Sequence, residues 1–274
     1  MSRNQDRLGG VQQHDTSPPP QQGGEGFSFV VPTEFVDLPS QGRFYAQGHP
    51  LHGKDSIEIK QMTAKEEDIL TSRTLLKKGV ALDKLIESII MDKRIDPSSL
   101  LIGDRNAIII AARVSGYGND YSASVQCPAC ETKQNYGFDL NSAKIVHGEM
   151  KDNLGVTDNG DGTITCVLPK TQITVVARLL TGREERRLMD SANNNQTIST
   201  QLQSIIISAN GDSSPQALDY VANNLPSFDS RHLRMILKMA TPNVDLTQQF
   251  SCTECGHEQE MEVPLTANFF WPNR

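Results

Sequence analysis

Four of the five cysteines in this 274-residue sequence form two Cys-x-x-Cys pairs, Cys127 with Cys130 and Cys252 with Cys255. Two sulfurs so close along a chain can face the same ion, and Zn²⁺ in a structural site is held by four ligands at the corners of a tetrahedron. The two pairs together supply a full set of thiolates. The spacing therefore predicts a structural zinc site of these four cysteines, with no open position for a substrate.

The same cysteines allow other chemistry. Iron accepts an all-cysteine site, and a disulfide within a pair would form only after oxidation. A thioredoxin-like redox pair needs its first cysteine at the start of a helix, and neither pair leads into a helical pattern. His257 could replace one thiolate, but four cysteines favour a supporting or surface role for it. Cys166 lies in a strand-like stretch and is expected to be a small buried apolar residue.

No residue pattern in the sequence indicates catalysis. The six histidines form no His-Glu-x-x-His motif, and neither a Gly-x-Ser-x-Gly motif nor a glycine-rich phosphate loop is present. Residues 157–168 resemble a calcium loop, but Leu168 stands where the bidentate glutamate belongs, so a hairpin turn at Asp161-Gly162 is favoured. We therefore expect a protein that is not an enzyme.

The charge of the chain argues against nucleic acid as a partner. Lys and Arg number 26 and Asp and Glu number 33, a formal net charge of −7, and no basic stripe interleaved with aromatic residues is present. The alternative function is that of a zinc-ribbon nucleic-acid-binding or transcription factor, because zinc ribbons are common in such proteins. The longest apolar run, residues 107–112, is far shorter than the ~20 residues that cross a bilayer, and no secretory leader is recognisable. We expect neither membrane insertion nor export.

Strand and helix patterns precede and follow each cysteine pair in the same order. In the first half we expect a short strand at 57–59, helices at 64–77, 82–93 and 104–115, and strands at 121–127 and 133–140. The second half offers a strand at 173–176, a helical stripe of Leu202, Ile205, Ile206 and Ala209, a helix at 229–240, and strands on both sides of its cysteines. Thr63 with Glu66 and Thr181 with Glu184 read as capping boxes at helix starts.

The two halves align at two fixed separations. Four positions between Thr63 and Leu70 recur 118 residues later, and five positions between Asp104 and Leu140 recur 125 residues later. The difference corresponds to an insertion of seven residues. We infer an α+β fold with an internally duplicated strand–helices–strand–Cys-x-x-Cys–strand module, whose copies are joined by a zinc-ribbon-like four-cysteine site. Coincidence of common residues is the weaker explanation.

These patterns divide the chain into three parts. Residues 1–26 offer almost nothing to bury and predict a disordered arm, or an arm that orders on a partner. Residues 27–145 form the first repeat with the first cysteine pair, and residues 146–274 form the second repeat with the second pair. The second repeat ends in an aromatic tail of Phe269, Phe270 and Trp271. Such a tail either packs on its own domain or anchors in a groove of a partner.

Several stretches in the first half match a known pattern, namely residues 31–40 with Gly42, Phe44 and Tyr45, then residues 57–72, 75–79, 101–107 and 127–130. Over roughly residues 31–140 the chain resembles the baseplate hub subunit and hub-assembly proteins of T-even-type contractile-tailed bacteriophages. The resemblance implies a structural or assembly protein that works in the host cytoplasm and contacts other hub, spike or wedge proteins. It leaves open whether the protein stays in the virion tail baseplate and whether it forms homo-oligomers.

Overall fold

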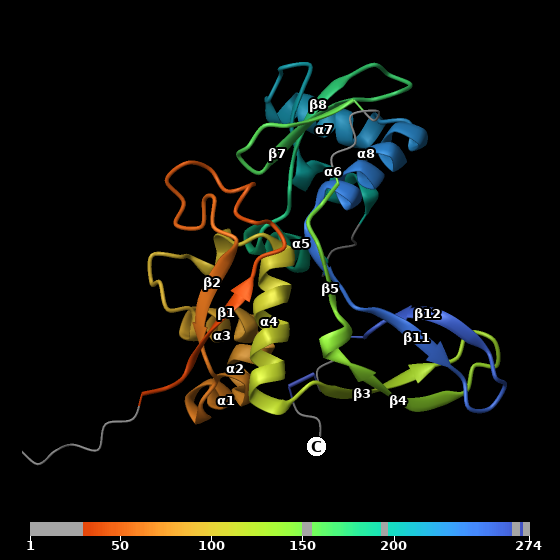
Figure 1. Cartoon of the computed structure of the whole chain (residues 1–274). Coiled ribbons are helices and arrows are strands. Elements are labelled where there is room, and N and C mark those ends of the chain that lie inside the picture. The colour runs from red at the N-terminus through yellow and green to blue at the C-terminus, as the bar shows by residue number, and fades with distance from the viewer. Residues whose placement is uncertain (1–29, 150–154, 193–196, 265–268, 271–274) are drawn as a thin grey trace, which may run out of the picture. The chain divides into compact units, whose positions relative to one another are not determined.

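Helices and small antiparallel sheets alternate along the chain, so the fold is of the α+β class (Figure 1). The structure is a computed structural model and describes residues 30–149, 155–192, 197–264 and 269–270. The predicted arm of residues 1–26 and Trp271 lie outside the described residues. From residue 32 onward, the described residues form one compact unit. None of the described helices is long and apolar enough to cross a membrane.

The first half follows the predicted order with shifted boundaries. Its elements are β1 (Thr33–Asp37), β2 (Ser56–Lys60), α1 (Ala64–Thr71), α2 (Arg73–Lys77), α3 (Ala81–Ile89), α4 (Ile102–Tyr117), β3 (Asp120–Gln126), β4 (Lys133–Asp139) and β5 (Lys144–Val146). The helix expected at 64–77 is split, because Ser72 has an extended backbone and caps α2 by accepting from the N–H of Leu75. The helix expected to reach residue 93 ends at Ile89, since Ile90 is extended and forms a bridge with Ile59.

The second half has elements beyond those that the sequence indicated. Its elements are β6 (Val156–Asp158), β7 (Thr163–Val167), β8 (Thr174–Arg178), α5 (Gly182–Ala192), α6 (Ile198–Ile205), β9 (Ile206–Ala209), α7 (Pro215–Asn224), α8 (Ser227–Ala240), β10 (Asn243–Asp245), β11 (Thr247–Ser251) and β12 (Glu258–Glu262). Among the elements that the sequence did not indicate are α7, β9 and β10. The helical stripe expected through Ala209 is wrong, because α6 ends at Ile205 and the following β-branched residues pair with β8 as strand β9. Strand β6 pairs with β7 and extends this sheet to the order β6-β7-β8-β9.

Both predicted capping boxes are confirmed. The Glu66 carboxylate accepts the N–H of Thr63 at 2.9 Å, and the Glu184 carboxylate accepts the N–H of Thr181 at 3.2 Å. In each half the last residue of the preceding strand supplies a cation to this carboxylate. The Nζ of Lys60 lies 2.7 Å from Glu66, and a guanidinium nitrogen of residue 178 lies 3.4 Å from Glu184. The same three roles are thus filled at positions 118 residues apart.

A buried aspartate occupies the third position of both α4 and α8. The Asp104 carboxylate accepts the N–H of Ser40 at 2.9 Å, its hydroxyl at 2.6 Å and the hydroxyl of Tyr45 at 2.7 Å. The Asp229 carboxylate accepts the N–H groups of residues 170 and 171, both at 2.9 Å. Each carboxylate therefore fastens the loop that follows an early strand, after β1 or after β7, to the start of a long helix.

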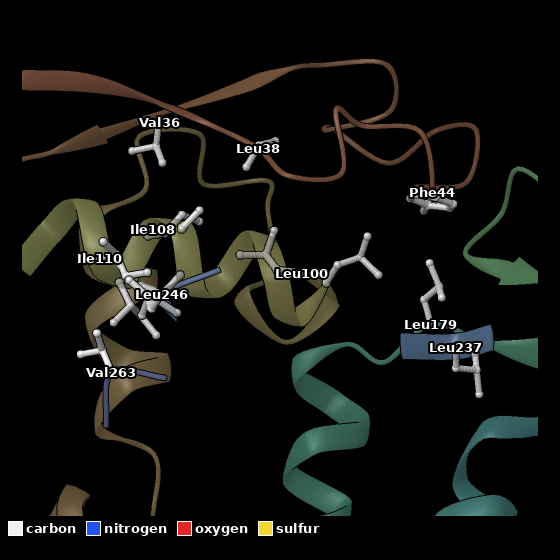
Figure 2. Close-up of a cluster of buried hydrophobic side chains, with 14 of the residues drawn as sticks. Val36, Leu38, Phe44, Leu100, Ile108, Ile110, Leu179, Leu237, Leu246 and Val263 are labelled. Atoms are coloured by element: carbon white, nitrogen blue, oxygen red, sulfur yellow. The ribbon is translucent and has the colours of Figure 1, made fainter. Parts of the chain in front are cut away.

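Apolar side chains of both halves belong to one hydrophobic cluster. Figure 2 shows part of it, with Val36, Leu38 and Ile108 from the first half and Leu179, Leu237 and Val263 from the second. The predicted burial of the apolar run 107–112 in α4 is confirmed, since Ile108, Ile109 and Ile110 are all buried. Because the burial of apolar surface is the main favourable contribution to folding, this shared cluster stabilises the two halves together.

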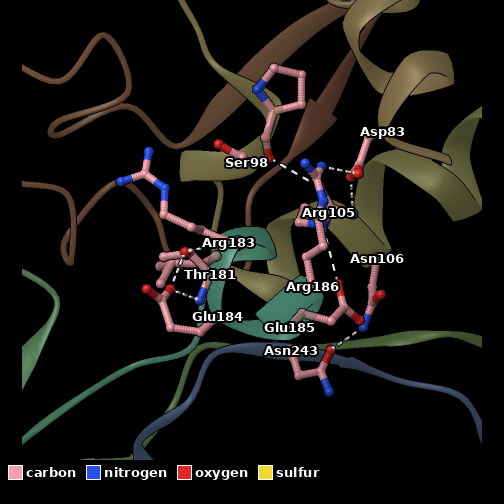
Figure 3. A network of polar contacts seen from close by, with 12 residues as sticks. Asp83, Ser98, Arg105, Asn106, Thr181, Arg183, Glu184, Glu185, Arg186 and Asn243 are labelled. Carbon is pink, nitrogen blue, oxygen red and sulfur yellow. Dashed lines mark hydrogen bonds and ion pairs between the residues drawn. The ribbon is translucent and has the colours of Figure 1, made fainter. Parts of the chain in front are cut away.

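Arg105 of α4 ties this core to the second half through polar contacts (Figure 3). Its guanidinium is 7 % exposed and donates to Asp83 at 2.7 Å and to the carbonyl of Pro97 at 3.0 Å. Glu185 of α5 lies 3.6 Å from the Nε of Arg105, and Arg186 also pairs with Asp83. A short antiparallel pairing of β5 with β10 makes a second junction between the halves. These contacts join the two halves of the chain.

Candidate metal centre

Each cysteine pair lies in the turn of a β-hairpin (Figure 1). Strands β3 and β4 flank the first pair, and strands β11 and β12 flank the second, as the sequence predicted. In each turn the N–H of the first cysteine donates to the carbonyl five residues later at 2.9 Å, and the N–H of the residue four positions later donates back to that cysteine's carbonyl. The two turns therefore have the same backbone hydrogen bonds.

The fourth residue after the first cysteine has a left-handed backbone in both turns. This residue is Glu131 in the first turn, with φ of 61°, and Gly256 in the second, with φ of 69°. Glycine adopts this conformation without steric cost, whereas a side chain at Glu131 makes it less favourable. The left-handed backbone at Glu131 is locally strained, and this conformation turns the chain back toward the sulfurs.

The four sulfur atoms of Cys127, Cys130, Cys252 and Cys255 lie within 4.8 Å of one another. The Sγ atoms of Cys127 and Cys255 are 3.7 Å apart, and those of Cys130 and Cys252 are also 3.7 Å apart. A disulfide needs about 2.05 Å, so these cysteines are free thiols. Zinc–sulfur bonds of ~2.3 Å in a tetrahedron separate the sulfurs by about 3.8 Å. The donor set therefore fits a tetrahedral metal ion.

Protonation at this cluster depends on the neighbouring donors. Hydrogen bonds from the side chain and the backbone of Thr132 lower the pKa of Cys130 to about 6. The backbone N–H of His257 lowers the pKa of Cys255, but the adjacent Cys130 sulfur and burial outweigh it and raise that pKa to about 12. Four sulfurs this close cannot all ionise without a cation between them, since like charges repel strongly at such distances. A bound metal ion would supply that cation.

The two hairpins also contact each other along their length. The Tyr136 hydroxyl donates to the carbonyl of Gln249 at 3.0 Å, and its ring lies 5.1 Å from that of Phe250, which is fully buried. Gln134 accepts from both the N–H and the hydroxyl of Thr253, in the second cysteine turn. These contacts align the turns, so the sulfurs are brought together by the strands as well as by any ion.

Other residues singled out by the sequence have structural roles. Cys166 is buried in β7, and this burial raises the pKa of its thiol to about 11. His257 is not among the clustered ligand groups. The calcium-like stretch forms the turn between β6 and β7, where Gly162 has φ of 84° and Asp161 accepts the N–H of Thr163. The prediction of a hairpin turn there is confirmed.

A serine–histidine contact that the sequence did not indicate fails the test for a nucleophile. The N–H of Leu51 donates to Nδ1 of His49, so the ring proton is on Nε2, and Nε2 donates to the hydroxyl of Ser99 at 3.0 Å. Ser99 gives its own proton to the carbonyl of Asp96 at 2.7 Å. A general base must accept the serine proton, and this histidine does not.

Two residues of the predicted aromatic tail, Phe269 and Phe270, pack on their own chain, against a partner that the sequence did not indicate. Phe269 and Phe270 are each 4 % exposed. Arg113 of α4 is fully buried, and its Nε donates to the carbonyl of Phe269 at 2.6 Å. The ring of Phe269 also lies edge-on to Tyr121, with centroids 5.2 Å apart. A charged residue within the apolar stretch of α4 was the signal for this contact.

The comparisons with known proteins give one result. A family model described as T4 bacteriophage base plate protein matches residues 32–271. No curated protein and no solved structure matches the chain. The match includes both halves and all four clustered cysteines.

Proposed function

We propose, because the chain belongs to the T4 bacteriophage base plate protein family, that it acts in the baseplate hub as a non-enzymatic structural or assembly component. The family match from residue 32 to residue 271 carries this proposal. The hub, as opposed to another part of the baseplate, is favoured by the resemblance of residues 31–140 to hub and hub-assembly proteins. The protein would be made in the host cytoplasm and join the tail during assembly.

The proposal includes a structural Zn²⁺ held by Cys127, Cys130, Cys252 and Cys255. The equal sulfur separations of 3.7 Å and the matching turns support it. Four thiolates complete the coordination shell, so the ion would have no free position for substrate and would stabilise the fold. Its role would be to fasten the hairpin of the first half to that of the second.

We further propose that the chain contains two copies of one module, residues 27–145 and 146–274. The recurrence of the capping boxes with their strand cations, of the buried aspartates and of the cysteine turns supports this duplication. Two similar modules fixed to one ion would present two similar surfaces. One surface would contact hub or spike proteins, and the other a neighbouring baseplate subunit.

Two measurements test the proposed function. Elemental analysis of the purified full chain should find one zinc per polypeptide, and a metal-free protein or one that holds iron would contradict the zinc site. Mass spectrometry of purified baseplates and of their assembly intermediates should detect the chain in at least one of them. If it is absent from all of them, or if it shifts labelled DNA in a salt-dependent manner, the baseplate role is wrong and the nucleic-acid alternative gains support.

A further inference from the structure

Helix α8 has an exposed face that is both apolar and basic. We call this set of five exposed side chains the outer face of α8: Phe228, Arg231, Arg234, Met235 and Lys238. They fall within about a third of the helix circumference, at 3.6 residues per turn. Phe228 is 58 % exposed and Met235 is 45 % exposed. The only acidic residue of this helix, Asp229, is buried on the opposite side.

The corresponding face of α4 is covered by the chain itself. A Cβ at Gly103 would lie 2.0 Å from the carbonyl oxygen of Pro242, so this backbone packs directly on the helix. Asn106 donates to Asn243 at 3.1 Å, and Arg113 donates to the carbonyl of Phe269. A strand segment and an aromatic residue thus cover α4 along more than two turns.

Helix α8 lacks such a cover among the described residues. The residues 125 positions after Gly103 and Asn106 are Phe228 and Arg231, and both are exposed. Lys238 stands where α4 has the fully buried Arg113. The exposed face therefore lies where, in the other half, a cation binds a backbone carbonyl and an aromatic ring packs nearby.

The charge of this face contrasts with that of the whole chain. The chain has a net charge of −7, yet all three charged residues of the outer face of α8 are cations. No described carboxylate forms an ion pair with Arg231, Arg234 or Lys238. A groove of about 790 Å³ adjoins the face, and its lining holds the cations Arg178, Arg234 and Lys238 together with the carboxylates Glu185, Asp245 and Glu262, so the charges of the groove are balanced. The outer face of α8 carries only cations, so it attracts acidic groups, and its two exposed apolar side chains give an apolar group a place to bind.

We propose that the outer face of α8 is a docking site for an acidic segment of another baseplate protein that carries a large apolar side chain. This inference rests on the proposed baseplate function and on the comparison of α4 with α8. A polypeptide is favoured over nucleic acid, because polypeptide covers the matching face of α4. In addition, the phosphates of a nucleic acid would contact the apolar side chains of Phe228 and Met235, which such a contact does not stabilise. The three cations would pair with carboxylates, and the two apolar residues would bury the partner's side chain.

Photo-crosslinking tests the proposal in assembled baseplates. A benzophenone amino acid replaces Phe228 or Met235 in the full chain, which complements a phage that lacks the gene. We expect crosslinks to one other baseplate protein, within a segment rich in Asp or Glu. Crosslinks to DNA, to a second copy of this chain or to a basic segment, or no crosslink at all, would overturn the proposal.

Charge reversal gives a second readout. The triple variant R231E/R234E/K238E should reduce incorporation into baseplates by about tenfold or more, with unchanged zinc content and unfolding temperature. The matched control reverses three exposed cations on α1 and α2, K65E/R73E/K77E, and should incorporate normally. If wild-type protein is found in baseplates and the α8 variant enters equally well, only the docking site is wrong. If wild-type protein is absent from every assembly, the proposed function itself fails.

Discussion

Helices α4 and α8 lie at matching places in the two halves, yet their surroundings differ. The buried residues of α4 include both arginines, Arg105 and Arg113, whereas the basic residues of α8 are not buried. Both helices begin with a buried aspartate at the third position. The shared start is set by hydrogen bonds to a loop of the same half, and the different burial is set by the segments that reach α4 from the other half. The comparison separates what a module specifies by itself from what the whole chain adds.

Substitutions of the metal-binding cysteines should have the largest effect on stability, and they test whether the two halves share one ion. If one ion holds both hairpins, then Cys127→Ser in the first half and Cys252→Ser in the second should be equally harmful. Each should abolish stoichiometric metal binding and lower the unfolding temperature by roughly 10 °C or more, because structural zinc contributes much of the folding free energy in such sites. Metal analysis and thermal denaturation measure both effects. Cys166→Ser serves as the control and should retain the metal, and unequal results for Cys127 and Cys252 would contradict a shared ion.

Substitutions on the two faces should differ in the size of their effect on stability. Gly103→Ala places a Cβ against the backbone of Pro242, and since backbone cannot easily move, we expect a loss of about 3 kcal/mol in the free energy of unfolding. Phe228→Ala, at the matching position of α8, removes an exposed ring and should change it by less than about 0.5 kcal/mol. Urea denaturation measures both. A large loss at residue 228 would mean that the outer face of α8 is covered within the monomer.

The two buried aspartates should respond to pH in opposite directions. Burial raises the pKa of Asp229, but the N–H groups of Lys170 and Thr171 outweigh it and lower that pKa. Its stabilising contribution is therefore present above the ordinary pKa near 4 and is lost as pH falls through the lowered value. Burial raises the pKa of Asp104, with only partial compensation from Ser40 and Tyr45. Folding therefore favours its neutral form, and its contribution declines as pH rises through the ordinary value.

Asparagine substitutions separate these two carboxylates. At pH 7, Asp229→Asn should cost about 2 kcal/mol in the free energy of unfolding, because a charged acceptor of two backbone N–H groups is lost. Asp104→Asn should cost about 1 kcal/mol or less, since burial raises the pKa of Asp104 and folding therefore already favours an uncharged group at this position. The difference should shrink below pH 4. Denaturation curves at pH 3.5 and pH 7 measure it, and a larger cost at Asp104 would refute this assignment.

Substitutions in the two cysteine turns should have the smallest effects on the free energy of unfolding. Glu131→Gly should raise the free energy of unfolding by about 0.5 to 1 kcal/mol, because glycine relieves the left-handed strain. Gly256→Ala should lower it by about 1 kcal/mol, since a Cβ there meets no other atom and only the backbone conformation resists it. Chemical denaturation of the metal-loaded protein checks both. Effects of the same sign would show that the turns differ more than their hydrogen bonds indicate.

Local features of the fold were predictable from the sequence. The capping residues Thr63 and Thr181, the hairpins around the cysteines and the apolar run of α4 all depend on neighbours a few residues away. The proximity of Cys127 and Cys255 was predictable as well, because a metal site of four cysteines brings together ligands that are far apart in the sequence. Zinc as the bound ion stays a prediction.

Features that depend on distant partners were not predictable. Strand β9 begins where Ile206 finds the edge of β8, and a helical spacing of apolar residues gave no sign of that pairing. The role of Arg113 depends on Phe269, which lies 156 residues away. Propensity and periodicity contain no information on such contacts, because tertiary packing decides them.

The anchoring of Arg113 has a consequence for how the chain reaches its native state. Its guanidinium enters an apolar interior in the first half, but one of its three carbonyl acceptors is supplied by Phe269. Until the segment with Phe269 packs on α4, the buried guanidinium of Arg113 lacks one of its hydrogen-bond acceptors. Packing of α4 in the native arrangement is therefore unfavourable early in folding. Folding should therefore be slow and concerted, with a high contact order, and a fragment that stops before Phe269 should remain prone to aggregation.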